Sequence, residues 1–138
     1  MVKSSDIRHG RHCVFLLHVH LVFVTKYRRK AFNKEVIDFL GKVFKKVCED
    51  FESKLVEFDG ESDHVHLLIN YPPKVSISKL VNSLKGVSSR RVRTQQFKSV
   101  CNTLWGDHLW SPSYFAGSCG GAPLELIKRY IQEQETPV

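Results

Sequence analysis

Several features that the sequence lacks narrow the kinds of protein it can encode. Its four cysteines show no CxxC spacing, which argues against a zinc ribbon. No apolar run is long enough to span a bilayer, and residues 1–11 are polar and charged, unlike a signal peptide. Repeats and low-complexity segments are also missing. We therefore expect a cytoplasmic protein with reduced cysteines and no membrane partner.

Acidic residues are few relative to basic ones. The 21 Lys and Arg residues against 14 Asp and Glu residues give a net charge of +7, which favours a polyanionic partner. The basic residues gather around Tyr27 and again towards the middle of the chain, at Lys26, Arg28, Arg29 and Lys30 and at Lys85, Arg90, Arg91, Arg93 and Lys98. An aromatic ring inside a basic run suits nucleic acid, with a plain solvated surface as the alternative.

Two His-x-His patterns lie within apolar segments that read as strands. Residues two apart in a strand point to the same face, so His64 and His66 place two imidazoles side by side. His18 and His20 have the same spacing. Converging neutral imidazoles make natural metal ligands, but a polar sheet face that happens to carry histidines explains either pair equally well. A third ligand elsewhere in the chain has to decide between them.

The last part of the chain offers a candidate for that ligand. A Gly120-Gly121 joint and Pro123 precede a segment with helical apolar spacing, in which Tyr130 and Gln134 are neighbours one turn apart. A phenol beside an amide oxygen provides a nucleophile and a metal ligand together. Taken alone, the two residues are better explained as a packing tyrosine and a solvated glutamine, because most tyrosines in helices are structural.

The elements are expected in the order β-α-β-β-α-β followed by a helix. The strands are expected at residues 13–25, 55–58, 63–71 and 114–118, and the helices at residues 33–52, capped by Asn33, from Ser76 or Ser78 to about 95, and near the end of the chain. This order predicts an α+β fold with a ferredoxin-like antiparallel sheet and an added C-terminal helix. Trp105 and Trp110 are read as core residues, with base stacking as the alternative.

Five ordered motifs give the sequence a specific resemblance. They are KYRRK at 26–30, DHVHLL at 63–68, KGVSSRR at 85–91, LWSPSYF at 109–115 and YIQEQ at 130–134. Together they resemble the single-tyrosine HUH transposases of the IS200/IS605 type, over nearly the whole chain. The resemblance implies one transposase domain over residues 1–138, with a polar arm at 1–11 and a joint and catalytic helix at 120–138.

The resemblance also implies a site. His64 and His66 match the metal-binding histidines, Gln134 the third ligand and Tyr130 the nucleophile, while His20 matches a histidine often found on the first strand. The implied cofactor is Mg²⁺ or Mn²⁺. The implied partners are single-stranded DNA with hairpin ends and a second copy of the chain, with active sites shared between subunits. Lys26 to Lys30, Lys85, Arg90 and Arg91 are expected to bind DNA, and His20 to support the site.

Three functions remain open at this point. The leading one is a transposase that cuts and rejoins single-stranded DNA through a 5′-phosphotyrosine. The second is a domesticated relative that binds or nicks palindromes. The third is a ferredoxin-like module that binds nucleic acid without catalysis. Covalent capture of DNA separates the third from the others.

Overall fold

A four-stranded antiparallel sheet organises the chain. The computed structural model describes residues 4–104, 108–118 and 124–134. The sheet has the strand order β4-β5-β3-β6, and every neighbouring pair is antiparallel. The strands are β3 (His18–Val24), β4 (Lys54–Gly60), β5 (His64–Asn70) and β6 (Phe115–Ser118). The two central strands, β3 and β5, are therefore the two that carry the His-x-His patterns.

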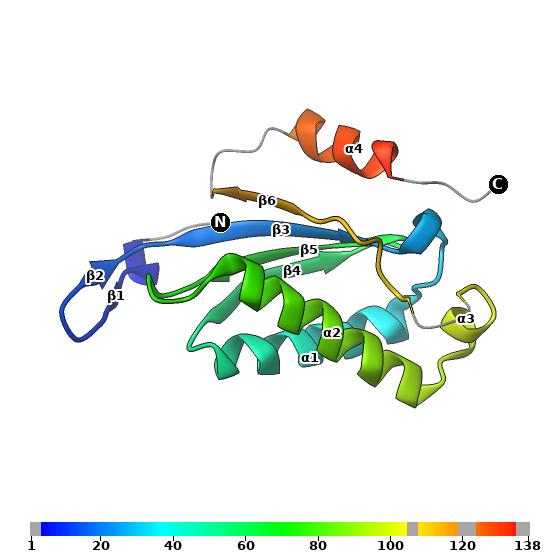
Figure 1. Ribbon diagram of the computed structural model, residues 1–138, viewed down its shortest axis with the longest axis horizontal. Coiled ribbons are helices and arrows are strands. Elements are labelled where there is room, and N and C mark those ends of the chain that lie inside the picture. The colour runs from blue at the N-terminus through cyan, green and yellow to red at the C-terminus, as the bar shows by residue number, and fades with distance from the viewer. Residues whose placement is uncertain (1–3, 105–107, 119–123, 135–138) are drawn as a thin grey trace.

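The helices lie on both faces of this sheet (Figure 1). Helices α1 (Lys34–Asp50) and α2 (Ile77–Gln95) cover one face, and α4 (Leu124–Glu133) lies over the other. Asn33 caps α1 by accepting a hydrogen bond from the Val36 amide at 3.0 Å, and Ser76 caps α2 by accepting one from Lys79 at 3.4 Å. The Asn33 cap was expected, and Ser76 was one of the two predicted starts of the second helix. The α+β prediction and the element order are confirmed.

The main core fills the space between the sheet and the pair α1 and α2. Alternate residues of β3 and β5 contribute to it, namely Val19, Leu21, Phe23, Val65, Leu67 and Ile69. Trp110 is buried there, and its indole N–H donates to Ser88 Oγ at 2.9 Å. This confirms the core role expected of Trp110. The alternation leaves the remaining residues of both strands, including all four histidines of the two patterns, on the face below α4.

The first predicted strand is wrong in its extent. Residues 13–25 are not continuous, because β2 (Val14–Phe15) pairs with β1 (Arg8–His9) in a separate small sheet before β3 begins. Val14 is 64 % exposed, so its apolar side chain belongs to no core. The polar arm folds back because Arg8 donates to Asn70 Oδ1 and to the Glu52 carbonyl. Tertiary hydrogen bonds therefore decide the structure of this segment.

Smaller differences concern the other elements. Strand β4 continues to Gly60 because Asp59 and Gly60 still pair with β5. A short helix, α3 (Lys98–Cys101), and two 3-10 turns, η1 (Ser4–Asp6) and η2 (Lys26–Arg28), were not predicted. Trp105 and the joint from Gly120 to Pro123 lie outside the described residues. Within the described ranges, no helix has the length and apolar character needed to cross a membrane.

Candidate active site

The two imidazoles of β5 form the centre of the site. His64 and His66 have ring centroids 4.9 Å apart and lie on one face of the strand, while Val65 and Leu67 between and beside them are fully buried on the other. This is the arrangement that the strand alternation predicts. The pair lies at the end of β5 next to η2, because His64 is opposite Val24, the last residue of β3.

Asp63 orients the first imidazole. The Nδ1 atom of His64 lies 2.7 Å from Asp63 Oδ1. An ionised carboxylate only accepts hydrogen bonds, so this contact places the proton of His64 on Nδ1 and leaves the Nε2 lone pair available. A carboxylate behind a histidine in this way is the usual support for a histidine that binds a metal.

His20 is the neighbour of the second imidazole. Its Nε2 atom lies 3.3 Å from Nδ1 of His66, across the β3–β5 pair. Burial lowers the pKa of His66 to about 4, with further lowering from the nearby His64 and His20. Burial also lowers the pKa of His20. His66 is therefore neutral at pH 7, which is the form that coordinates metal ions.

His18 lies far from this centre. It pairs with Asn70 at the opposite end of the strands, roughly 20 Å along β5 from His64 at the usual rise per residue. Its imidazole is buried, with Nε2 3.6 Å from Asp6 Oδ2, and burial lowers its pKa. The structure therefore separates the members of the first His-x-His pair. His20 joins the His64 and His66 cluster and His18 does not.

The terminal helix brings Tyr130 to the same face of the sheet. Tyr130 and Ile131 pack on Val22, Val24 and Phe115, and the rings of Tyr130 and Phe115 are 5.8 Å apart. The phenol donates to Ser113 Oγ at 3.0 Å. Burial raises the pKa of Tyr130, and the bond to Ser113 opposes this effect. In this arrangement the phenol keeps its proton at pH 7.

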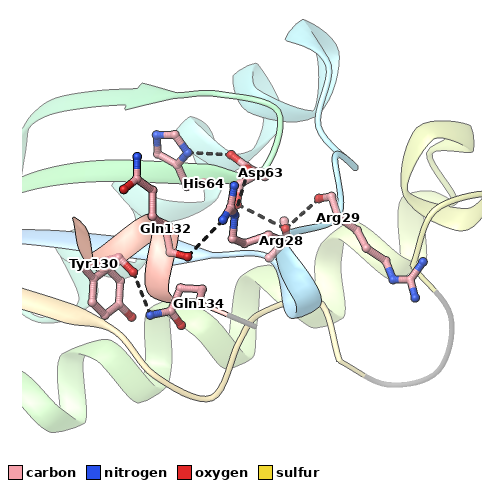
Figure 2. Close-up of polar contacts among 8 residues, drawn as sticks. Arg28, Arg29, Asp63, His64, Tyr130, Gln132 and Gln134 are labelled. Carbon is pink, nitrogen blue, oxygen red and sulfur yellow. Dashed lines mark hydrogen bonds and ion pairs between the residues drawn. The ribbon is translucent and has the colours of Figure 1, made fainter. Parts of the chain in front are cut away.

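Gln134 has different partners from those predicted for it. Its Oε1 atom accepts a hydrogen bond from Ser111 Oγ at 3.0 Å. Its Nε2 atom donates to the Tyr130 carbonyl at 3.1 Å, as Figure 2 shows. Among the described residues, no group of three or more His, Cys, Asp or Glu side chains is placed to hold a metal ion. The two imidazoles fit a metal, and the role of Gln134 as a third ligand stays a prediction.

The predicted DNA-binding residues divide into two groups. Those around Tyr27 lie in or next to η2, close to Asp63, whose carbonyl accepts from the Thr25 amide. Those of α2 lie in the helical layer on the other face of the sheet (Figure 1). Arg91 stacks on Phe39, and Lys85 donates to the carbonyls of Ser111 and Ser113. Only the first group is brought together with the histidines.

Three residues of the site were not assigned from the sequence. Asp63 contacts His64. Ser111 donates a hydrogen bond to Gln134, and Ser113 accepts one from Tyr130. All three lie inside motifs that carry the resemblance, so their position in those motifs was the available signal. The Lys85 ammonium contacts the same segment, because it donates hydrogen bonds to the backbone carbonyls of both serines. Burial lowers the pKa of Lys85.

Comparison with known proteins identifies the family of this chain. A family model described as "Transposase IS200 like" matches residues 13–134. The ISDra2 transposase TnpA of Deinococcus radiodurans is 31% identical over 134 residues, which cover 97% of this chain and 95% of the relative. The transposase for insertion sequence element IS200 of Salmonella typhimurium is 33% identical over 115 residues, covering 83% of this chain and 74% of the relative. The chain belongs to the IS200-like transposase family.

Solved structures support the same assignment. A Deinococcus radiodurans protein described as a transposase matches with a TM-score of 0.85 and 32% identity, over 94% of this chain and 99% of that one. A REP-associated tyrosine transposase bound to a REP hairpin matches with a TM-score of 0.58 and 11% identity, over 90% of this chain and 67% of that one. The second likeness concerns the fold alone.

Proposed function

We propose that this protein cleaves and rejoins single-stranded DNA at the ends of an insertion element through a 5′-phosphotyrosine intermediate. The observation that carries the proposal is the packing of a tyrosine helix over the sheet face that presents the paired imidazoles of His64 and His66, the first of them oriented by Asp63. Family membership supports DNA as the substrate. The hairpin in the related solved structure is consistent with hairpin ends as the DNA that this chain binds.

His64 and His66 would hold a divalent ion, and Gln134 is the proposed third ligand once it leaves Ser111. The mixed nitrogen and oxygen donor set is compatible with Mg²⁺ or Mn²⁺, which we propose as the cofactor. When bound, such an ion polarises the phosphodiester and offsets the charge of its oxygens. The chain contributes Asp63 and His20, which fix the orientation of the two imidazoles.

Tyr130 carries the covalent step in this proposal. Its phenol loses its proton as the oxygen forms a bond to phosphorus, the bond from phosphorus to the 3′ oxygen breaks, and the departing oxygen takes up one proton as a 3′-OH, so that no net proton is gained or lost. The phosphotyrosine keeps the energy of the broken bond, so rejoining needs no nucleotide cofactor. Because burial raises the pKa of Tyr130 and its phenol donates to Ser113, the side chain has to exchange this partner for the substrate before it reacts.

The proposal is tested by covalent capture of DNA. A labelled single-stranded oligonucleotide with hairpin ends is incubated with the purified chain in Mg²⁺ or Mn²⁺, and the products are separated under denaturing conditions. We expect a protein–DNA adduct that survives denaturation and disappears when EDTA replaces the metal. Binding without an adduct in either metal would indicate a module that binds nucleic acid without catalysis, and an adduct that persists in EDTA would remove the metal from the mechanism.

We also propose that two copies act together, because excising a segment requires cuts at two ends and a two-fold dimer is the commonest way to supply two sites. In the structure α4 packs on its own sheet, against Val22 and Val24. An exchanged α4 would make the same contacts with the partner's sheet. Shared sites are therefore compatible with the packing observed within one chain.

Mixing two inactive chains distinguishes shared sites from separate ones. One chain carries His64→Ala and His66→Ala, and the other carries Tyr130→Phe and a size tag. With shared sites, a heterodimer rebuilds one site of its two, so we expect about half of the adduct of the wild-type dimer. The adduct should lie on the untagged chain. A verified heterodimer that forms no adduct would show that each helix serves its own chain.

A further inference from the structure

The C-terminal end of α4 is held by a side chain from a distant loop. The last carbonyls of a helix lack partners within the helix. Here the Tyr130 carbonyl accepts from the Gln134 side chain, the Ile131 carbonyl accepts from the Gln134 amide, and the Gln132 carbonyl accepts from Arg28 Nη1 at 3.2 Å. A cation at this end also interacts favourably with the helix dipole. Arg28 therefore completes the cap of the helix that carries Tyr130.

The same guanidinium faces the carboxylate behind His64. Arg28 Nε lies 3.8 Å from Asp63 Oδ2, and the other oxygen of Asp63 is the one 2.7 Å from His64 Nδ1. The Arg28 and Asp63 side chains are only 27 % and 14 % exposed, so water screens their attraction weakly. Figure 2 shows the guanidinium between Asp63 and Gln132. One side chain thus contacts both the tyrosine helix and the support of a metal-site histidine.

We infer that Arg28 is a positioning residue that couples the docking of α4 to the orientation of His64. The inference rests on the proposed function for the roles of Tyr130 and His64. When α4 is docked, its Gln132 carbonyl helps to hold the guanidinium next to Asp63, and Asp63 keeps the His64 proton on Nδ1. When α4 leaves, Arg28 loses this partner and Asp63 loses a restrained neighbour. The docking of α4 therefore sets Tyr130 and His64 in place together.

The backbone conformation of η2 directs the Arg28 side chain towards Gln132 of α4 and towards Asp63. Tyr27 and Arg28 have φ values of 58° and 54°, in the left-handed region that residues with side chains avoid. Hydrogen bonds around the turn hold it there, since Thr25 Oγ1 donates to the Arg29 carbonyl at 2.7 Å and the Lys26 amide donates to the Leu109 carbonyl at 3.0 Å. The turn directs Arg28 towards α4, whereas Arg29 extends away from Asp63 and Gln132 (Figure 2).

The competing interpretation is that Arg28 is one more phosphate contact of the basic segment. Arg29 provides the matched comparison, because it is the next residue, carries the same charge and belongs to the same basic segment, where its guanidinium lies 5.7 Å from the centre of the Tyr27 ring. A phosphate contact alone predicts similar consequences for both residues. A positioning role predicts that only Arg28 affects the docking of α4 and the state of His64.

Hydrogen exchange of the full chain without DNA or metal measures the docking directly. In Arg28→Ala we expect the amides of α4 to exchange about three- to tenfold faster than in the wild type, because the helix end loses a charged cap. Arg29→Ala should leave α4 at the wild-type rate, and Arg28→Lys should lie between, since one ammonium replaces a fork of donors. Equal α4 exchange in the wild type and in Arg28→Ala would overturn the inference.

Two further measurements test the coupling. In ¹⁵N-histidine spectra, the Nδ1–H tautomer of His64 should dominate in the wild type and fall in Arg28→Ala. In single-turnover cleavage, Arg28→Ala should lower the rate at saturating DNA more than it raises Kd, whereas Arg29→Ala should act chiefly through Kd. The coupling would be contradicted if the His64 spectra of Arg28→Ala matched those of the wild type. It would also be contradicted if Arg28→Ala and Arg29→Ala raised Kd equally and neither lowered the cleavage rate at saturating DNA. If the wild type forms no adduct, the proposed function fails, while hydrogen exchange still reports whether Arg28 holds α4.

Discussion

Tyr130→Phe is expected to abolish the covalent protein–DNA adduct, with cleavage reduced by at least about a thousandfold, as when other enzymes lose a covalent nucleophile. The change removes one oxygen and leaves the ring packed on Phe115 and Val24. Among the described residues the phenol has one hydrogen bond, the exposed one to Ser113, so folding and DNA binding should change little. Denaturing gels measure the adduct, and thermal unfolding checks the fold.

Tyr114→Phe is the matched control for this prediction. Tyr114 follows Ser113 directly in the chain, but it packs against the main core instead of the face that carries the histidines. We expect its adduct to form at the wild-type rate. A normal adduct in Tyr130→Phe would assign the nucleophile to one of the three other tyrosines, Tyr27, Tyr71 or Tyr114, and the proposed mechanism would be wrong.

His66→Ala is expected to lower cleavage by more than about 100-fold while DNA binding stays close to the wild-type affinity. Losing even a residue that supports a metal ligand typically costs 10–100-fold in activity, and losing the ligand itself should cost more. The affinity should depend mainly on basic side chains, which this change leaves in place. Cleavage rates over a range of Mg²⁺ or Mn²⁺ concentrations, together with a binding isotherm in EDTA, measure the two effects separately.

The other histidines supply graded comparisons for this test. His20→Ala removes the neighbour of His66 Nδ1, so we expect an intermediate loss of about 10- to 100-fold. His18→Ala creates a buried gap near Asp6 at the far end of the strand, so its effect should fall on stability and not on cleavage. If His18→Ala abolished cleavage and His66→Ala did not, the metal site would be at the other His-x-His pair.

The histidine face was predictable because strand alternation is a local rule. The sequence around His64 and His66 contained the apolar partners that bury the opposite face, so the direction of both imidazoles followed without tertiary information. The choice between the two His-x-His pairs did not follow from that rule, because both satisfy it. It came from the family resemblance and stays a prediction, to which the structure adds that Asp63 contacts His64 and that His20 lies next to His66.

The features that could not be predicted depend on contacts between distant parts of the chain. The break before β3 follows from Arg8, whose partners Asn70 and Glu52 are 62 and 44 residues away. The position of Gln134 is set by Ser111, on a segment that Lys85 of α2 holds. The turn at Tyr27 and Arg28 requires backbone angles for which a glycine would be the usual signal, and the sequence has none there.

The alternation of β5 also determines how this segment can vary. Each of its first four residues serves either the buried core or the reactive face, because Val65 and Leu67 are fully buried and His64 and His66 face the other way. Substitutions of His64 or His66 should therefore give protein that accumulates normally but is inactive, whereas substitutions of Val65 or Leu67 should give unstable protein that accumulates poorly. A single-residue deletion within β5 would combine both, because it moves every later side chain to the opposite face.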